Sequence, residues 1–265
     1  MSEKIYAVKY GGNAMKSPEL KKAVMEDIVT LTKAGHKVVL IHGGGPEINK
    51  MLQKIGKEAV FIKGLRYTDE ETMEVVQSVL AGKVNKDLVA LIQVLGGKAM
   101  GLCGMDGAMF LCEKKQDDVD YGLVGEVVAV NPEPVLAAWE AGAIPVIATI
   151  GMGKDGQAYN INADTAAAAL AGALGADRFI SMTDVPGLLR DKDDPSTLIS
   201  QVDLAGVEKL IEEGILAGGM IPKVGACTAA LDAGVPQAQI IDGRTVHNLL
   251  AALAGEEPVG TTFTK

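Results

Sequence analysis

The segment VVLIHGGGPEI, residues 38–48, joins a short apolar run to a helix pattern through three consecutive glycines. The apolar run ends at His42, and Pro46 is a residue type favoured at the start of a helix. Glycines in such a turn expose backbone N–H groups at the helix N-terminus, where anions bind. A plain strand-to-helix turn is the alternative, but it rarely needs three glycines in a row. The segment therefore predicts an α/β fold with an anion site at the carboxyl end of a strand.

Short apolar runs and helix-period segments alternate along the whole chain. The main predicted strands are residues 4–10, 36–42, 98–104, 143–150, 177–184 and 237–242, and residues 109–115 and 123–130 form a predicted hairpin layer. The predicted helices are residues 17–35, 46–56, 69–97 (as one or two helices), 132–142, 162–176, 202–214 and 221–234. This order predicts a three-layer αβα sandwich around a mainly parallel sheet. A boundary at residue 176 divides the chain into two predicted lobes, 1–176 and 177–265.

The composition is that of a globular protein with an acidic balance. Of its 265 residues, 48% are hydrophobic and 22% are charged. The net charge of −9 argues against a nucleic-acid-binding protein, which normally carries a basic patch. Aromatic residues, at 4%, leave little for stacking on bases. A lysine at a site is therefore expected to serve a small anion.

The cysteines and histidines show no metal-binding or disulfide pattern. Cys103, Cys112 and Cys227 contain no CxxC spacing, and the three histidines are scattered. We therefore expect free thiols and no metal held by protein side chains. The N-terminal MSEKIYAVKY lacks the apolar core of a signal peptide, and no apolar run reaches the roughly 18 residues of a membrane span. These features predict a cytoplasmic protein.

The first predicted strand ends in an unusual way, with Lys9 followed by Tyr10, Gly11 and Gly12. A lysine that extends to solvent beside a glycine turn is the simpler interpretation. The second interpretation is a cation at the carboxyl end of a strand, beside backbone that can approach a ligand closely. Because the HGGG turn also follows a strand, both segments could border one crevice.

Polar residues also cluster before the predicted helix 162–176. Asn160, Asn162 and Asp164 precede it or lie in its first turn. Capping of the helix accounts for one of them, and three exceed what a cap requires. A carboxylate here could orient a lysine or bind a hydrated magnesium ion.

Two further cations, Lys223 and Arg66, could be ordinary solvated side chains, but their positions also suit the binding of an anion. In GGMIPKV, Pro222 is predicted as the first helical residue, which puts Lys223 in the first turn, where a cation opposes the helix dipole by about 0.3–1 kcal/mol. A bound anion would reverse that effect. Arg66 lies on a predicted loop before a helix capped by Thr68 or Asp69, and arginine binds carboxylates through two parallel hydrogen bonds.

Two other nucleotide-binding patterns are excluded. The chain has no GxxxxGK[ST] segment. GMGKDG, residues 151–156, matches GxGxxG, but the residues after it do not open a helix, and Asp-Gly suits a hairpin turn. A dinucleotide site is therefore not predicted there.

Taken in order, the motifs resemble the amino acid kinase family over nearly the whole chain, and most closely its members that act on N-acetylglutamate. The matching blocks are KYGGNAM, IHGGGPEI, GLRYTDEETMEVVQSVLAGKVNK, GLCGMDG, LVGEV, NINADTAAAALA, TDVPGLL and GGMIPKV. The resemblance implies ATP-dependent phosphorylation of the γ-carboxylate of N-acetyl-L-glutamate, a step of arginine biosynthesis. In that reaction the acceptor is already ionised, so positioning and electrostatics replace a general base.

The resemblance also implies roles for individual residues. Lys9 and Lys223 would neutralise charge on the transferring phosphoryl group, and Asp164 would hold both lysines in place. In the substrate site, Gly44 and Gly45 would donate backbone N–H groups, whereas Arg66 and Asn160 would bind the α-carboxylate and the acetamido group.

For the nucleotide, the resemblance implies a site in the C-terminal lobe, residues 177–265, which would bind ATP and the Mg²⁺ that ATP carries. The implied nucleotide-binding residues are Gly12, Thr183, Asp184, Gly187 and Leu189. The N-terminal lobe, residues 1–176, would bind the amino-acid substrate and form the dimer.

The resemblance also bears on assembly and on the alternatives. Arginine-inhibited family members carry an additional helix before the first strand, whereas three residues precede that strand here, which implies a homodimer insensitive to arginine. A sister kinase acting on N-acetyl- or carrier-linked aminoadipate is the nearest alternative. A non-catalytic sensor of nucleotide or amino acid is the second, although it would not need the two lysines and the aspartate together.

Overall fold

The computed structural model describes residues 2–15, 17–216, 218–255 and 258–265. The chain folds into two compact units, and each is described separately. The first consists of Met1–Val38 with Ala167–Lys265, and the second is Val39–Ala166. Helix α6 (Ala163–Ala173) carries the chain from the second unit into the first. The predicted division into lobes at residue 176, with a ligand assigned to each lobe, stays a prediction.

The first unit contains five neighbouring strands of the main sheet, in the order β14-β16-β15-β11-β1. Their bounds are Gln201–Asp203 (β14), Thr261–Thr264 (β16), Gln237–Asp242 (β15), Arg178–Thr183 (β11) and Ile5–Tyr10 (β1). β1, β11 and β15 run parallel, and β16 is antiparallel to β15. Tyr10 pairs with Met182, so β1 and β11 end side by side. The first and last of these three strands, β1 and β15, are buried over most of their length because both faces are covered.

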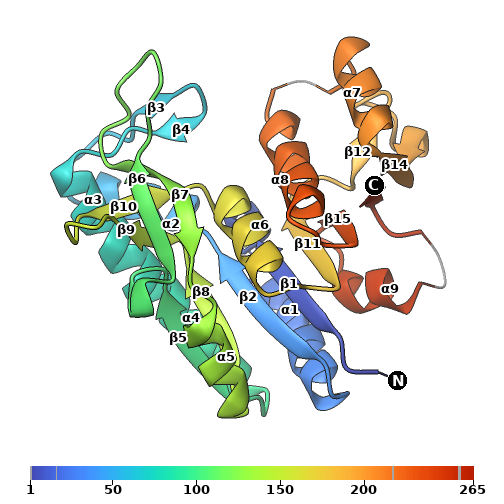
Figure 1. Cartoon of the computed structure of the whole chain (residues 1–265), viewed down its shortest axis with the longest axis horizontal. Coiled ribbons are helices and arrows are strands. Elements are labelled where there is room, and N and C mark those ends of the chain that lie inside the picture. Colours follow the sequence, from blue (N-terminus) through green and yellow to red (C-terminus); the bar gives the residue numbers. More distant parts are fainter. Residues whose placement is uncertain (1, 16, 217, 256–257) are drawn as a thin grey trace. The chain divides into compact units, whose positions relative to one another are not determined.

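Helices cover the strands of the first unit on both faces. In Figure 1, α8 lies in front of β11 and β15, whereas α1 lies behind β1. The helices are α1 (Pro18–Lys33), α7 (Leu204–Glu212), α8 (Met220–Asp232) and α9 (Asn248–Ala254), and two short strands, β12 (Leu188–Leu189) and β13 (Leu198–Ile199), form a separate ribbon. α1 begins as predicted, since Ser17 Oγ accepts a hydrogen bond from the Leu20 N–H. α8 begins two residues before Pro222, which corrects the predicted start but keeps Lys223 in the first turn.

The second unit combines three parallel strands with a small barrel. The parallel strands, in the order β2-β8-β5, are Lys37–His42 (β2), Ile144–Ala148 (β8) and Ala99–Cys103 (β5). The barrel consists of Phe110–Lys114 (β6), Val124–Val130 (β7), Ile150–Met152 (β9) and Ala158–Ile161 (β10). β6 and β7 are antiparallel, which confirms the predicted hairpin layer. β9 and β10 are also antiparallel around GMGKDG, as expected for a hairpin and not for a dinucleotide site.

The helices of the second unit include an irregular one. They are α2 (Gly45–Lys54), α3 (Glu70–Gln77), α4 (Asn85–Val94) and α5 (Glu133–Glu140), with a π-helix, η2 (Ser78–Val84), between α3 and α4. Residues 69–97 are therefore two α-helices joined by a π-helical turn. Figure 1 shows α5 in front of the strands and α4 behind them. The α/β class and the mainly parallel sheet are confirmed.

One short hairpin was not predicted. β3 (Phe61–Ile62) and β4 (Leu65–Arg66) pair antiparallel around Lys63 and Gly64, which both have positive φ angles, 47° and 83°. Two such residues form the tight turn that suits a two-residue hairpin loop. Arg66, predicted on a loop, therefore lies on a strand.

None of the described helices is both long enough and apolar enough to cross a membrane.

Candidate active site

The glycine turn after β2 is shaped by its neighbours in the second unit. β2 ends at His42 and α2 begins at Gly45, so the predicted strand–turn–helix is confirmed. A Cβ atom at Gly44 would lie 2.6 Å from Leu80 Cδ2 and 3.2 Å from Val84 Cγ2. A side chain at position 44 would therefore displace Leu80 and press on Val84, so glycine suits the packing against the π-helix. α2 starts directly beside the cavity described next.

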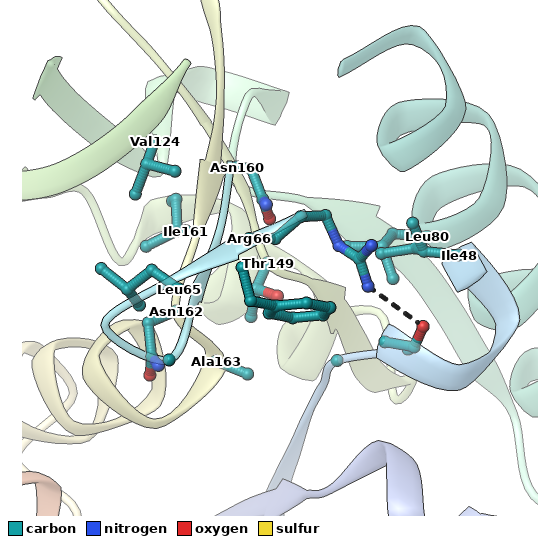
Figure 2. A pocket seen from close by; sticks show the side chains of 15 residues that line it. Ile48, Leu65, Arg66, Leu80, Val124, Thr149, Asn160, Ile161, Asn162 and Ala163 are labelled. Atoms are coloured by element: carbon teal, nitrogen blue, oxygen red, sulfur yellow. Dashed lines mark hydrogen bonds between the residues drawn. The ribbon is translucent and has the colours of Figure 1, made fainter. Parts of the chain in front are cut away.

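A cavity of about 180 Å³ lies within the second unit, next to this turn. Figure 2 shows its lining, which comes from the glycine turn, the β3–β4 hairpin, the barrel and the start of α6. Its lining includes all four predicted substrate-binding residues: Gly44, Gly45, Arg66 and Asn160. Residues separated by more than a hundred positions in the sequence thus surround one small space.

Arg66 is the most constrained of the four. Its side chain is buried, with 7% of the residue exposed. Nη2 donates to Asn49 Oδ1 at 2.6 Å and to the Gly45 carbonyl at 3.3 Å, and the guanidinium lies 4.8 Å from the centre of the Phe61 ring. Nη1 is buried and has no hydrogen-bond partner among the described residues. Burial lowers the pKa of Arg66 from its usual range. A buried cation with an unsatisfied donor favours an anionic ligand at this position.

The asparagines at the other side of the cavity have different roles. Asn160 Nδ2 donates to Thr68 Oγ1 at 3.1 Å, and the residue lines the cavity (Figure 2). Asn162 Oδ1 accepts hydrogen bonds from the backbone N–H groups of Asp164 and Thr165, at 2.9 and 3.2 Å. Asn162 is therefore the cap of α6. The side chain of Asp164 is not needed for capping.

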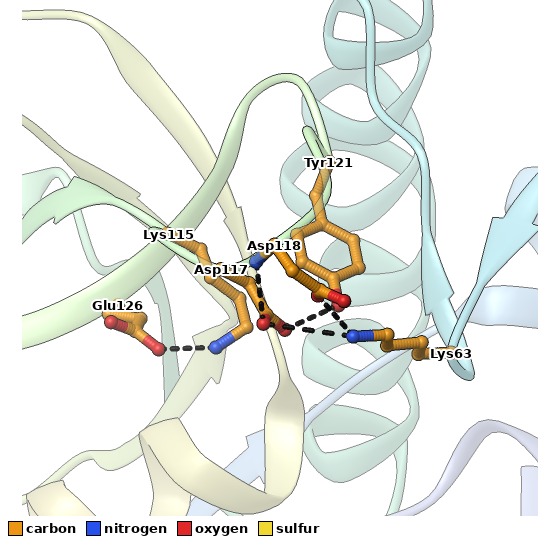
Figure 3. A network of polar contacts seen from close by, with 6 residues as sticks. All are labelled: Lys63, Lys115, Asp117, Asp118, Tyr121 and Glu126. Carbon is orange, nitrogen blue, oxygen red and sulfur yellow. Dashed lines mark hydrogen bonds and ion pairs between the residues drawn. The ribbon is translucent and has the colours of Figure 1, made fainter.

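The tip of the β3–β4 hairpin is held by charged residues of the second unit. Lys63 forms ion pairs with Asp117 and Asp118, and Asp117 accepts a 2.8 Å hydrogen bond from the Tyr121 hydroxyl (Figure 3). The pKa of Asp117 is lowered by the hydrogen bond from the backbone N–H of Asp118 and, second, by the hydrogen bond from the Tyr121 hydroxyl. These contacts support the hairpin from the side of the barrel, so that Phe61 and Arg66 face the cavity.

His42 is fully buried at the end of β2, and both of its ring nitrogens have partners. Nδ1 lies 2.9 Å from the Gly43 carbonyl oxygen, and Nε2 lies 3.1 Å from Asn85 Nδ2. The pKa of His42 is lowered to about 4, mainly by burial; the Gly43 hydrogen bond partly opposes this, and the nearby Lys86 ammonium adds a smaller lowering. The imidazole is therefore neutral at pH 7.

This depressed pKa predicts a pH-dependent stability. In the unfolded chain the histidine pKa is about 6.5, so between pH 6.5 and 4 the unfolded state binds more protons than the folded state. The contribution of His42 is fully present above pH 6.5 and is lost as pH falls, by about 3 kcal/mol at pH 4. Urea unfolding of the wild type and His42→Asn at pH 6.5, 5 and 4 measures it. The gap between the two proteins should narrow by that amount, and a constant gap would contradict the assignment.

In the first unit, Lys9 lies at the carboxyl end of β1 with 5% of its surface exposed. A Cβ atom at Gly11 would lie 3.4 Å from Lys9 Nζ and 3.1 Å from the Met182 carbonyl oxygen. The Gly11 N–H donates to that carbonyl at 3.0 Å. The tighter of these contacts is with the Met182 backbone, so glycine suits the close approach of this turn to the end of β11.

The predicted nucleotide-binding residues belong to the same unit. Gly12 begins a short 3₁₀ turn after β1, and Thr183 ends the neighbouring strand β11, where its hydroxyl donates to Asp184 Oδ1 at 3.1 Å. Gly187 has a φ angle of 148°, and a Cβ there would lie 2.6 Å from Thr261 Oγ1, while Leu189 ends β12. The parallel pairing of β1 and β11 thus puts Gly12 and Thr183 at the same edge of the sheet.

Lys223 is half-buried in the first turn of α8, and its Nζ donates to the Gly219 carbonyl at 3.5 Å. Lys223 and Lys9 belong to the first unit and Asp164 to the second. Their predicted common site stays a prediction. In the part of the chain that the structure describes, no group of three or more His, Cys, Asp or Glu side chains could hold a metal ion.

Comparison with known proteins decides the family. Residues 4–242 match the model of the amino acid kinase family. The chain belongs to that family. An acetylglutamate kinase of Actinobacillus pleuropneumoniae serotype 3 (strain JL03) is 55% identical over 263 residues, which cover 99% of this chain and 91% of the relative. One of Clostridioides difficile (strain 630) is 53% identical over 262 residues, with the same shares. The solved structure of smu.665 from Streptococcus mutans UA159 matches with a TM-score of 0.81 at 30% identity, over 98% of each chain.

The family predicted from the order of the motifs is thus confirmed. In this amino acid kinase, several cavity residues were not predicted from the sequence. Its apolar wall consists of Ile48, Phe61, Leu65, Leu80, Val124, Ile161 and Ala163. Leu65 had a usable signal, since it adjoins Arg66. Leu80 had none, because its direction depends on the π-helical turn.

Proposed function

We propose that this chain transfers a phosphoryl group from ATP to the γ-carboxylate of N-acetyl-L-glutamate, as in arginine biosynthesis. The observation that carries the proposal is the buried Arg66 guanidinium, which keeps an unsatisfied Nη1 beside the cavity next to the start of α2. A carboxylate supplies the acceptors that this donor lacks, and its charge compensates the cost of burying the cation. The acetylglutamate kinases at 53–55% identity support the same substrate.

The lining of the cavity suits the rest of this substrate. Asn160 offers an amide that can pair with the acetamido group, and Val124 and Ile161 offer apolar contacts for a methyl group. The N–H groups at the start of α2, around Gly44 and Gly45, favour the second carboxylate because a helix N-terminus attracts anions. The substrate would thus lie with its α-carboxylate at Arg66 and its γ-carboxylate at the glycine turn.

The chemistry follows from charge. A carboxylate acceptor is ionised at pH 7, so no group needs to remove a proton from it. The obstacle is repulsion between the acceptor and the phosphoryl oxygens. In the proposal, Lys9 and Lys223 stabilise the charge that develops during transfer, and Asp164 orients both ammonium groups. Each 1.36 kcal/mol of stabilisation in the transition state is worth about tenfold in rate.

The nucleotide part of the proposal uses the first unit. Gly12, Thr183, Asp184, Gly187 and Leu189 would bind ATP, and Mg²⁺ would arrive with the nucleotide. Homodimer formation is part of the same proposal.

ADP release with a panel of acids tests the proposal. We expect the highest kcat/KM with N-acetyl-L-glutamate, and at least 100-fold lower values with L-glutamate and L-aspartate, because these would leave Asn160 and the apolar wall without a partner. N-acetyl-aminoadipate differs by one methylene, which is worth about 10- to 200-fold. A preference for the aminoadipate derivative would instead indicate the sister kinase. Binding of ATP without turnover of any acid would indicate a sensor.

A further inference from the structure

The imidazole of His42 is built into a network that the proposed reaction does not use directly. Gly43 O can only accept a hydrogen bond, so His42 Nδ1 must carry the proton that it donates over 2.9 Å. Nε2 then has a lone pair, which accepts from Asn85 Nδ2 over 3.1 Å. The two contacts agree on one tautomer. His42 thereby links the first glycine of the turn to a helix residue 43 positions away.

Asn85 is itself held on several sides. Its Nδ2 also lies 2.8 Å from the carbonyl oxygen of Val146 on β8 and 3.2 Å from that of Leu102 on β5, so three acceptors, His42 Nε2 included, share its two hydrogens. Its Oδ1 accepts from Lys86 Nζ at 3.0 Å. A Cβ atom at Gly101 would lie 2.0 Å from Asn85 Oδ1, so that glycine leaves the space that the carboxamide fills. The carboxamide therefore has a fixed direction relative to the strands.

The π-helix η2 explains how Asn85 reaches this position. The backbone N–H of Asn85 donates to the Leu80 carbonyl five residues earlier, as in a π-helical turn. One extra residue in a turn rotates all later residues by about 100° relative to a continuous α-helix. The turn thus allows Asn85 to face the strands while Leu80 lines the cavity and, with Val84, packs on Gly44. The π-helix η2 thus positions both Asn85, which contacts His42, and Leu80, which packs on Gly44.

The direction of the Gly44 N–H follows from the geometry of the peptide bond. The described chain contains no cis peptide, and a trans peptide points its C=O and the following N–H in opposite directions. A hydrogen bond that fixes the Gly43 C=O toward the imidazole therefore fixes the Gly44 N–H away from it. Without this bond, the peptide between two glycines could rotate at low cost. Gly43 and Gly44 line the cavity, whereas His42 is buried behind them.

We propose that His42, held by Asn85, is a positioning residue that aims the Gly44 N–H into the cavity for the carboxylate that accepts the phosphoryl group. The inference rests on the proposed function, since it assigns the backbone donor that binds the reacting oxygen. His42 does not touch the substrate. It acts by fixing the orientation of the peptide between Gly43 and Gly44. The imidazole must be neutral, because a proton on Nε2 would point at the N–H donor of Asn85.

The test compares two substitutions of His42. One keeps an aromatic ring without a hydrogen-bond donor, and the other keeps a donor on a smaller side chain. His42→Phe keeps an aromatic ring, although a larger one, and has no donor for Gly43. His42→Asn has a smaller side chain, yet its amide nitrogen takes the place of Nδ1 and can donate to the same carbonyl. We expect His42→Phe to reduce kcat/KM for N-acetyl-L-glutamate about 100-fold, as is typical for loss of one oxyanion donor, with the KM for ATP changed less than threefold. His42→Asn should recover at least tenfold over His42→Phe.

A packing role predicts that activity in the two variants follows the thermal unfolding midpoint and not the presence of a donor for Gly43. Equal losses in the two variants, or lower activity in His42→Asn, would overturn the inference. His36→Phe is the matched control, because His36 precedes β2, packs edge-on against Tyr6 with ring centres 5.2 Å apart, and lies outside the site. It should leave both kinetic constants within twofold of the wild type.

A measurement without turnover separates this inference from the proposed function. In protein labelled with ¹⁵N-glycine, the Gly44 amide should give one sharp resonance in the wild type and His42→Asn, and a broadened or shifted one in His42→Phe. An unchanged resonance in His42→Phe would overturn the positioning role even if the wild type phosphorylates N-acetyl-L-glutamate. If the resonance broadens or shifts in His42→Phe while the wild type phosphorylates a different acid, the positioning role is retained and only the proposed substrate is rejected.

Discussion

Lys9→Ala should lower kcat at least 100-fold while the unfolding midpoint stays within a few degrees of the wild type. Lys9 is 5% exposed and lies at the carboxyl end of β1. A cation that is held in place before the reaction begins stabilises developing negative charge without reorganisation, and such groups are worth several kcal/mol. Loss of about 3 kcal/mol corresponds to a factor of about 100 in rate. Because the proposed role is in the transition state, the effect should appear in kcat more than in either KM.

The measurement is steady-state ADP release combined with thermal unfolding of each variant. Lys4→Ala is the matched control, since Lys4 precedes the same strand, has a side chain that is 46% exposed, and pairs with Asp177 at 2.6 Å. An exposed ion pair of this kind contributes little, so kcat should stay near the wild-type value. Lys223→Ala should resemble Lys9→Ala if both cations act on the same phosphoryl group, and the double variant should then lose less than the product of the two effects. A near-normal kcat in both single variants would contradict the proposed chemistry.

Arg66→Lys should raise the KM for N-acetyl-L-glutamate at least 30-fold with little change in the KM for ATP. The substitution keeps the positive charge and most of the apolar stem, but it removes the guanidinium that lies over the Phe61 ring. It removes the planar pair of nitrogens, of which Nη2 bonds Asn49 and Gly45 while Nη1 is unsatisfied. A lysine cannot satisfy Asn49 and bind a carboxylate through two parallel bonds at the same time. Loss of such a buried charged pair costs about 2–5 kcal/mol.

Initial rates at saturating ATP, with the acid varied, give this KM directly. Arg178→Lys is the matched control, because Arg178 lies at the start of β11 in the other unit, where its Nη1 donates to the Ala252 carbonyl at 3.1 Å. It should leave the KM for the acid unchanged. If Arg66→Lys also left that KM unchanged, the α-carboxylate would have to bind elsewhere. A fall in kcat alone would assign Arg66 to the transition state instead of to substrate binding.

Much of the site could be predicted because its signals are local. A strand that ends at His42, three glycines and a proline describe a strand–turn–helix with backbone donors, and the structure has it there. The KYGG segment likewise predicted a lysine at the carboxyl end of a strand, followed by a glycine turn, and β1 ends in that way. The sequence alone could not identify the cap of α6, because Asn160, Asn162 and Asp164 all suit that role. Only the hydrogen bonds in the structure identify Asn162.

By itself, the sequence determined the α/β class and the glycine turn, because these depend on hydrophobic periodicity and on residue types that restrict the backbone locally. The family followed from the resemblance of its ordered motifs. Only the tertiary structure decided that Arg66 is buried on a two-residue strand and that residues 69–97 contain a π-helical turn. It also decided that His42 and Asn85 meet behind the glycine turn. These features depend on which side chains pack together from distant parts of the chain, and a periodic pattern within one segment carries no record of its neighbours in space.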